Sequence, residues 1–339
     1  MTPSASQVQQ SSGRILAIDF TKGILVLLMV VYHVLNYHQF GSIPHDYIGF
    51  LPSSFIMIAG FLAARVYLAG HRLSAPMLGR RLGIRALKLL LLFTCLNVAA
   101  QMVWSRNRYG TELSVHGFLQ QWFNVYVTGD AQGVAFDVLV PISYTLLLAI
   151  PVLSIQAVKP RFLALLAIAT FIVCATTGAY GSSIGNLNLV SAGVIGMWLG
   201  TRDQRAVDRV TGSWQFVLAL LAFYLCVVVF GPDNYGSQIL ITCIALLVIY
   251  SIGRMVPLEG WCARQVRLLG RYSLVSYVVQ ILYLQGARAI ETLHLTSPMA
   301  AATLMTLVIG LLTWATVVVL DESRSRVKTM DRLYMLVFG

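Results

Sequence analysis

The sequence predicts an all-α, polytopic integral membrane protein with about ten transmembrane helices, and three observations support this fold class. Of 339 residues, 58% are hydrophobic and only 11% are charged, whereas soluble domains carry about 25% charged residues. The mean hydropathy is +0.76. The apolar residues also gather into about ten stretches near the roughly 20 residues that a helix needs to cross a bilayer. Composition and patterning therefore both favour helical membrane spans.

The distribution of basic residues orients these spans. The apolar stretches cover 16–37, 49–69, 86–105, 136–157, 162–180, 186–201, 214–231, 238–253, 269–287 and 299–320. Ten spans place both termini on one side, and most Lys and Arg residues fall in the loops and tail on that side. Arg106, Arg108 and Arg288 fall on the other side. The positive-inside rule then puts both termini in the cytoplasm. This asymmetry accounts for the net charge of +11, so nucleic acid is not an expected partner.

The remainder of the chain offers little room for a soluble domain. We expect 1–13 to be a disordered cytoplasmic leader, 14–325 to be a single transmembrane domain, and 326–339 to be a cytoplasmic tail. The five cysteines are scattered and show neither metal-binding nor disulfide spacing. No metal and no permanently bound cofactor are therefore expected. The composition implies the lipid bilayer as a partner and leaves open whether the chains form a homo-oligomer.

Ionisable residues lie along one stripe of the first apolar stretch. Lys22 and His33 are eleven positions apart, which is three helical turns plus about 20° and roughly 16 Å along the axis. Asp19 joins the same face because it lies three residues before Lys22. A charge near the bilayer centre costs about 2.5–3.5 kcal/mol, so we expect this stripe to face a protein interior or a wet cavity. Asp19 and Lys22 are equally placed to neutralise each other as an ion pair.

A histidine in this stripe is the candidate general base. In the expected topology His33 lies toward the outer end of its helix, with Asn36 and Tyr37 one turn further on. A neutral imidazole accepts the proton of an attacking hydroxyl; an interfacial histidine bound to headgroups is the alternative. Asp137 and Tyr144 share a helix face seven residues apart and are candidates to orient the imidazole. Asp137 is equally placed to cap its own helix.

A dense basic cluster precedes the third apolar stretch. Arg80, Arg81 and Arg85 are followed by Lys88, and the last three share one helical face. Guanidinium groups bind phosphates in a bidentate geometry, so this cluster is suited to the nucleotide end of coenzyme A. The alternative is ordinary positive-inside anchoring. Arg65 lies inside the second stretch, near its cytoplasmic end.

Two further segments carry polar and aromatic residues together. The outer loop 106–135 places Trp122 among other aromatics and amides, a mixture suited to sugar rings but also typical of interfacial belts. In the ninth stretch Ser273, Tyr277 and Gln280 lie on one helix face. Such polar seams often join membrane helices to one another.

Four stretches carry a resemblance to a known family. They are Asp19-Phe20-Thr21-Lys22-Gly23 with His33, Phe55–Phe61 running into Ala63–Tyr67, the Arg80–Arg85 cluster, and Leu269-Gly270-Arg271-Tyr272-Ser273 with Tyr277. In this order they resemble the acyltransferase-3 superfamily of membrane acyltransferases, nearest to the OpgC-like enzymes that succinylate periplasmic glucans.

The chain also departs from that family's pattern. Relatives carry Arg at the position of Lys22, Asp at Tyr32, a small hydroxyl residue at Ala59 and often His at Gln280. The segment that begins at Asp19 also resembles the lysosomal heparan acetyltransferase group. Succinyl and acetyl therefore both stay open as the acyl group.

The resemblance implies a multi-pass O-acyltransferase of the bacterial inner membrane. It would move an acyl group from a cytoplasmic acyl-CoA, either succinyl-CoA or acetyl-CoA, to a hydroxyl of an extracytoplasmic glycan. His33 would take the acceptor's proton, with Asp137 or Tyr144 orienting it. The residues expected to bind the donor are Lys22, Arg65, Arg80, Arg81, Arg85 and Lys88. The residues expected to contact the substrates are Asp19, Asn36, Tyr37, Trp122, Tyr277 and Gln280.

Two other classes of protein fit the same features. A transporter or flippase would use the intramembrane charges as a substrate route. A structural membrane scaffold would leave the stripe from Lys22 to His33 dispensable.

Overall fold

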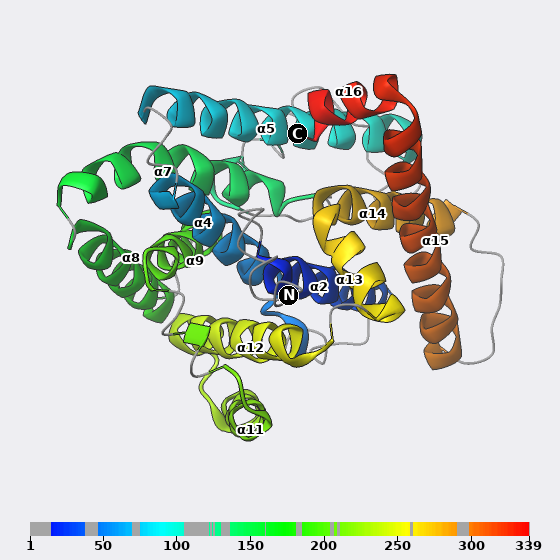
Figure 1. The fold of residues 1–339 in the computed structure, drawn as a ribbon. Helices are drawn as coiled ribbons and strands as arrows, with labels where there is room; N and C mark the ends of the chain where they lie inside the picture. Colours follow the sequence, from blue (N-terminus) through cyan, green and yellow to red (C-terminus); the bar gives the residue numbers. More distant parts are fainter. Residues whose placement is uncertain are drawn as a thin grey trace, which may run out of the picture. The chain divides into compact units, whose positions relative to one another are not determined.

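The computed structural model contains helices and no strands in the part of the chain that it describes, which confirms the all-α class (Figure 1). It describes residues 15–37, 47–69, 75–104, 122, 124, 126–129, 136–159, 161–180, 185–203, 207–208, 211–257, 260–289 and 298–338. The expected leader, 1–13, lies outside these residues. Contacts divide the chain into two compact units. Unit 1 comprises Met1–Leu51, Gln204–Gly231 and Ile241–Arg332, and unit 2 comprises Pro52–Asp203, Pro232–Leu240 and Leu333–Gly339.

Nine of the ten apolar stretches each correspond to one helix, whereas the ninth, 269–287, begins in the last turn of α13 (Trp261–Arg271) and continues in α14. These helices are α2 (Leu16–Tyr37), α4 (Leu51–Ala69), α5 (Ala75–Trp104), α7 (Leu139–Val158), α8 (Phe162–Ala179), α9 (Gly185–Gly200), α11 (Trp214–Phe230), α12 (Tyr235–Met255), α14 (Ser273–Ala289) and α15 (Pro298–Arg326). Among the described residues, six segments are long and apolar enough to cross a membrane, and they lie in α2, α5, α7, α8, α12 and α15. Shorter apolar segments lie in α4, α11 and α14. These are the helices of a multi-pass membrane protein; the count of ten spans and the side of the termini stay predictions.

Two helices lie where no span was expected. Helix α13 (Trp261–Arg271) begins inside the expected loop 254–268, and α16 (Lys328–Val337) lies in the expected tail. Helix α13 is amphipathic: Arg264, Arg267 and Arg271 share one face by their spacing. The expectation of a plain loop was wrong because a short helix with several arginines has no apolar run long enough to stand out.

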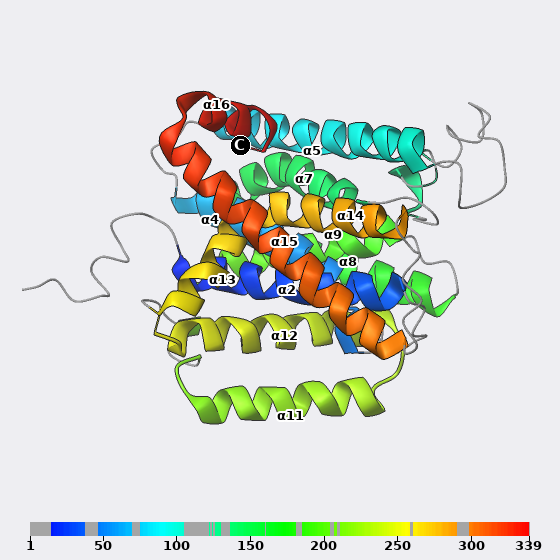
Figure 2. The ribbon, with the colours of Figure 1, turned by 90° about the vertical axis from the view of Figure 1, so that its right-hand side faces the viewer.

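Helix α2 is the centre of unit 1, where it packs against α13, α14 and α15. In Figure 2, α15 crosses diagonally over α2 and α14. The apolar cluster among these three helices consists of Val30, Val34, Ala302 and Ile309, with Tyr283, Leu284 and Met305 packed against it. This packing buries Val30 and Val34, in the C-terminal half of α2, in a protein interior.

Two glycines allow α2 and α13 to cross closely. A Cβ at Gly23 would lie 1.9 Å from the carbonyl oxygen of Val266, and one at Gly270 would lie 1.7 Å from that of Asp19. Backbone this close leaves no space for any side chain. The helices therefore meet through the segments Asp19–Gly23 and Leu269–Ser273.

We expect Gly270→Ala to destabilise the protein in detergent. Moving the α2 and α13 backbones apart costs about 1–3 kcal/mol or more, which exceeds the roughly 1 kcal/mol that alanine gains over glycine in a helix. Thermal unfolding followed by size-exclusion chromatography measures the effect. Gly310→Ala is the matched control, because nothing lies within 4 Å of a Cβ there. Equal midpoints for both variants would contradict the close crossing.

In unit 2, two glycines likewise allow α4 and α9 to cross closely. A Cβ at Gly60 would lie 2.0 Å from the backbone oxygen of Gly193, and one at Gly196 would lie 2.0 Å from that of Met57. Small residues at helix contacts are typical of membrane proteins, where close van der Waals packing holds helices together. Helices α5, α7 and α8 complete this unit through contacts of α7 with α5, α8 and α9.

Candidate functional site

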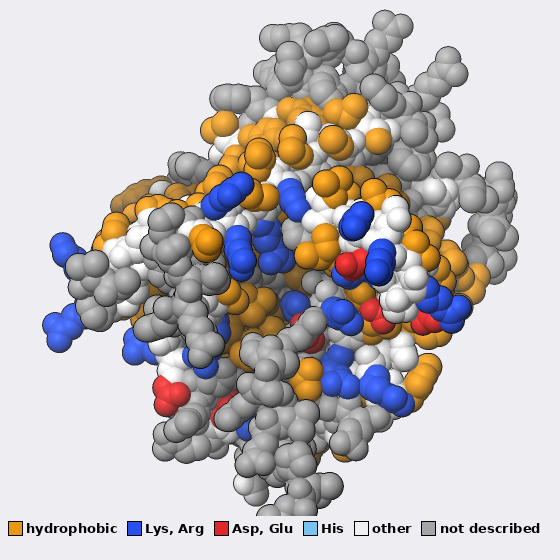
Figure 3. Space-filling view, turned by 45° about the horizontal axis from the view of Figure 1, so that its top comes forward, with side chains coloured by type: hydrophobic (Ala, Val, Ile, Leu, Met, Phe, Trp, Pro, Cys, Tyr) orange, Lys and Arg blue, Asp and Glu red, His pale blue; other side chains and the backbone are white. Residues whose placement is uncertain are grey.

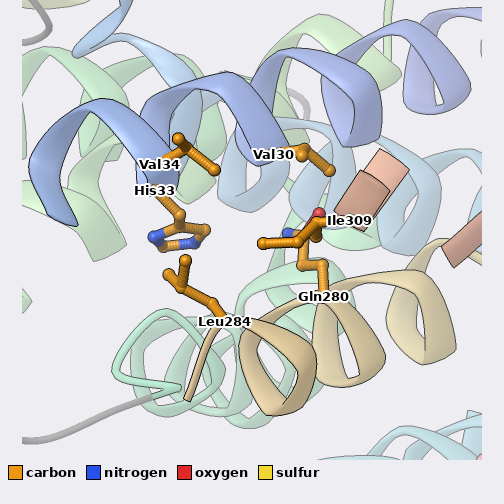
Figure 4. Close-up of a pocket in the computed structure, with 6 residues that line it drawn as sticks. All are labelled: Val30, His33, Val34, Gln280, Leu284 and Ile309. Atoms are coloured by element: carbon orange, nitrogen blue, oxygen red, sulfur yellow. The ribbon is translucent and has the colours of Figure 1, made fainter. Parts of the chain in front are cut away.

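His33 lies in a small pocket of unit 1. The pocket is lined by residues of α2, α14 and α15, namely Val30, His33, Val34, Gln280, Leu284 and Ile309. Figure 4 shows the imidazole directed from α2 toward Leu284 of α14, with Gln280 and Ile309 on the adjacent side. The pocket holds no space large enough for a water molecule. A ligand therefore enters only when the lining side chains shift.

Three polar side-chain atoms of two residues in this pocket are buried without a partner in the described part of the chain. They are the Nε2 atom of His33 and both amide atoms of Gln280. The Gln280 side chain is almost wholly enclosed, at 2% exposure. A buried polar atom without a hydrogen bond costs about 1–3 kcal/mol. These atoms lie on two facing helices, so a polar group that entered the pocket could hydrogen-bond to both.

Tyr277 packs beside the imidazole. Its ring centroid lies 6.2 Å from that of His33, and the ring centroid of Tyr32 lies 5.6 Å from that of His33. Tyr277 is buried. The two aromatic rings therefore restrict the orientation of the His33 side chain. Sequence reasoning placed Tyr277 and Gln280 on one face of a helix, and the structure adds that this face meets His33.

Asp19 and Lys22 form an ion pair at the other end of α2. The Lys22 Nζ lies 2.9 Å from the Asp19 Oδ1, and the two side chains are 17% and 10% exposed. The mutual neutralisation that the spacing allowed is therefore present. By helix geometry this pair lies roughly 16 Å along the axis from His33. Helix α13 crosses α2 at this end through Val266 and Gly270.

A polar network that the sequence did not suggest joins the end of α13 to α15 and α16. The Tyr272 hydroxyl donates to Asp321 at 2.6 Å and accepts from Arg324 at 3.0 Å. Arg271 lies 3.4 Å from the same carboxylate, and Arg324 also pairs with Asp331 at 2.6 Å. No local pattern indicates this network because Tyr272 and Asp321 are 49 positions apart.

The proposed partners of the imidazole lie in unit 2. The Asp137 side chain accepts from the backbone N–H of Val138 at 2.9 Å. It does not cap α7, because the N-cap residue of this helix is Val138 and the cap has no side-chain hydrogen bond. The Tyr144 hydroxyl donates to the carbonyl oxygen of Tyr126 at 2.9 Å. Their role in orienting His33 stays a prediction.

The basic cluster before the third span is helical. Arg81, Arg85 and Lys88 share a face of α5, as predicted. Arg80, Arg81 and Arg85 are exposed. Figure 3 shows several Lys and Arg side chains at the surface of the face that it draws. No described residue forms an ion pair with these three arginines. The Lys88 Nζ donates to the carbonyl oxygen of Met335 at 2.8 Å.

The remaining predicted site residues have diverse surroundings. Arg65 donates to the carbonyl oxygen of Arg202 at 3.2 Å, just beyond the end of α9. Trp122 is buried against the rings of Phe93 and Tyr126. Asn36 is exposed. The side chain of Tyr37 lies outside the described residues.

The structure brings together two of the four stretches that resemble membrane acyltransferases. Gly270 of Leu269–Ser273 touches the backbone of Asp19–Gly23 in unit 1, whereas Phe55–Tyr67 and Arg80–Arg85 belong to unit 2. Comparisons of the chain with protein-family models, with curated proteins and with solved structures find no match.

Proposed function

We propose that this protein is a membrane O-acyltransferase. It transfers an acyl group from an acyl-CoA in the cytoplasm to a hydroxyl of a glycan on the opposite side of a bacterial inner membrane. The observation that supports this proposal is the buried, unpartnered Nε2 of His33 facing an unpartnered Gln280 amide across one pocket. One group suits proton acceptance and the other suits donation to a developing oxyanion.

The reaction needs only these two groups and the substrates. The acceptor hydroxyl gives its proton to the Nε2 of His33 as its oxygen forms a bond to the thioester carbonyl carbon. The Gln280 amide donates to the carbonyl oxygen as that oxygen becomes negative. The carbon–sulfur bond then breaks, and the coenzyme A thiolate takes the proton from the imidazolium. The cation therefore exists only beside an anion, which limits the cost of its burial.

The length of α2 matches the donor. The arm of coenzyme A has about twelve bonds between its phosphate-ester oxygen and its sulfur, as many as in four residues of extended chain, or about 14 Å. The distance from Lys22 to His33 is roughly 16 Å. A thioester at His33 therefore leaves the phosphates near Lys22, at the end of α2 where α13 crosses it.

The arginines of α5 are a second candidate phosphate site. We expect the double variant Arg81→Gln/Arg85→Gln to raise the KM for acyl-CoA about tenfold or more with little change in kcat, because it removes charge-assisted contacts made equally in ground and transition states. Steady-state kinetics with varied donor measure this effect. The double variant Arg326→Gln/Lys328→Gln removes the same charge elsewhere and is the control. Unchanged KM in both variants would leave the α5 cluster as a topology anchor.

Inverted membrane vesicles test the proposed function. Their outer surface is the cytoplasmic face, and the envelope glycans of the producing cells supply the acceptor. Added acyl-CoA with a radiolabelled acyl group should place label on the enclosed glycan and release coenzyme A. Vesicles that carry His33→Gln should not. Movement of a solute across the membrane without an acylated product would instead indicate a transporter and would contradict the proposed function.

A further inference from the structure

Helix α16 carries an exposed apolar stripe beside a basic one. Leu333, Leu336 and Val337 fall within about 100° of the helix surface, and all three are exposed, Leu336 at 69% and Leu333 at 53%. Lys328 and Arg332 are also exposed and share the adjoining side, because they lie four residues apart. This separation of apolar and basic sides makes α16 amphipathic. Such helices are typical of membrane interfaces.

Helix α15 brings the chain to the membrane surface at the point where α16 begins. Its 29 residues extend over about 44 Å, which matches the roughly 40–45 Å of a bilayer with both headgroup layers. Exposed apolar side chains continue along α15 as far as Val319, and the polar segment from Asp321 to Arg326 follows. A span of this length ends in the headgroup layer. Helix α16 follows it after a single residue, Val327.

An ion pair holds the bend between the two helices. In the last turn of α15, the Nε and Nη2 atoms of Arg324 donate to one carboxylate oxygen of Asp331 in α16, at 2.9 Å and 2.6 Å. Figure 2 shows α16 turned away from the direction of α15. At ten residues, or about 15 Å, α16 is too short to cross a bilayer. A short helix that is bent back at the level of the headgroups lies along the membrane surface.

We infer that α16 is an interfacial helix bound to lipid. Leu333, Leu336 and Val337 insert into the leaflet that α15 enters, and Lys328 and Arg332 are directed to the headgroups and water. This inference does not depend on the proposed function. Lipid is favoured over a protein partner because the stripe directly follows a membrane span at the level of the headgroups. The basic residues beside the stripe also suit the phosphate groups of lipids.

Fluorescence quenching in lipid nanodiscs measures the surroundings of each side of α16. The exposed cysteines Cys95, Cys226 and Cys262 are first replaced by alanine in the full chain. A single cysteine is then introduced by Leu336→Cys or by Lys328→Cys and labelled with the fluorophore NBD, and the chain without an introduced cysteine gives the blank. The nanodiscs contain phosphatidylcholine and phosphatidylglycerol. One quencher is a lipid nitroxide placed roughly 5–10 Å below the headgroups, where the apolar face of an interfacial helix lies, and the other is aqueous iodide.

We expect the lipid nitroxide to quench the label at Leu336→Cys several-fold more than the label at Lys328→Cys, and iodide to show the reverse order. Leu333→Cys should behave as Leu336→Cys does, and it replaces that variant if the latter does not elute as a single folded species. Equal quenching by iodide on both sides of α16 would place the stripe in water and overturn the inference. Protection of the Leu336→Cys label from both quenchers would also overturn it, because protein and not lipid would then cover the stripe.

Discussion

The variant His33→Gln should lose acyl transfer almost completely while it still inserts into the membrane. Glutamine keeps a polar side chain of similar volume but cannot take a proton, and general-base catalysis contributes about 10²–10⁴ in rate. We expect kcat to fall by this factor with little change in donor KM, because the imidazole acts in the transition state. Labelled glycan in inverted vesicles measures the rate.

A matched truncation controls for packing. Val31 lies two residues from His33, about 200° around α2 and therefore on the opposite face. Val31→Ala removes an aliphatic group near the same depth without touching the pocket, and we expect it to retain transfer. Elution as a single folded species in detergent should be the same for both variants. Full activity in His33→Gln would exclude the imidazole as the base.

The second large effect is expected at Gln280. Gln280→Leu removes the amide that would donate to the oxyanion, and loss of one such donor costs about 10²–10³ in kcat. The same change removes two buried polar atoms that have no described partner. We therefore expect thermal stability to be kept or raised while transfer falls, because an apolar side chain of similar size relieves the burial cost.

A variant that keeps or gains thermal stability while it loses activity identifies a functional residue. A glutamine that served only to hold α14 against α2 would lose stability when replaced and would affect transfer through folding alone. The measurements are the thermal midpoint in detergent and kcat in vesicles. A lower midpoint with unchanged kcat in Gln280→Leu would assign the side chain a packing role and contradict the oxyanion contact.

The positions of the helices follow from the sequence because the signal is local. A run of apolar residues long enough to cross a bilayer is visible without knowledge of its neighbours, and all ten expected stretches are helical. The apolar pattern did not predict helix α13, because its arginines interrupt the run of apolar residues. Its amphipathic spacing was present in the sequence but was counted as loop charge.

The candidate site could be predicted only in part. The spacing from Lys22 to His33 and the seam of Tyr277 and Gln280 are each periodic along one helix, so each could be inferred alone. That these two faces meet depends on how α2, α14 and α15 pack. The pairing of Tyr272 with Asp321 depends on the same packing.

The sequence by itself determined a multi-pass helical membrane protein with ionisable residues along its first helix, because hydropathy and helical periodicity act over a few turns. Only the tertiary structure decided that His33 meets Gln280 and not a charged residue among those described, and that Gly23 and Gly270 let α13 approach α2. Contacts between segments far apart in the chain arise from packing, and no short window of sequence contains them.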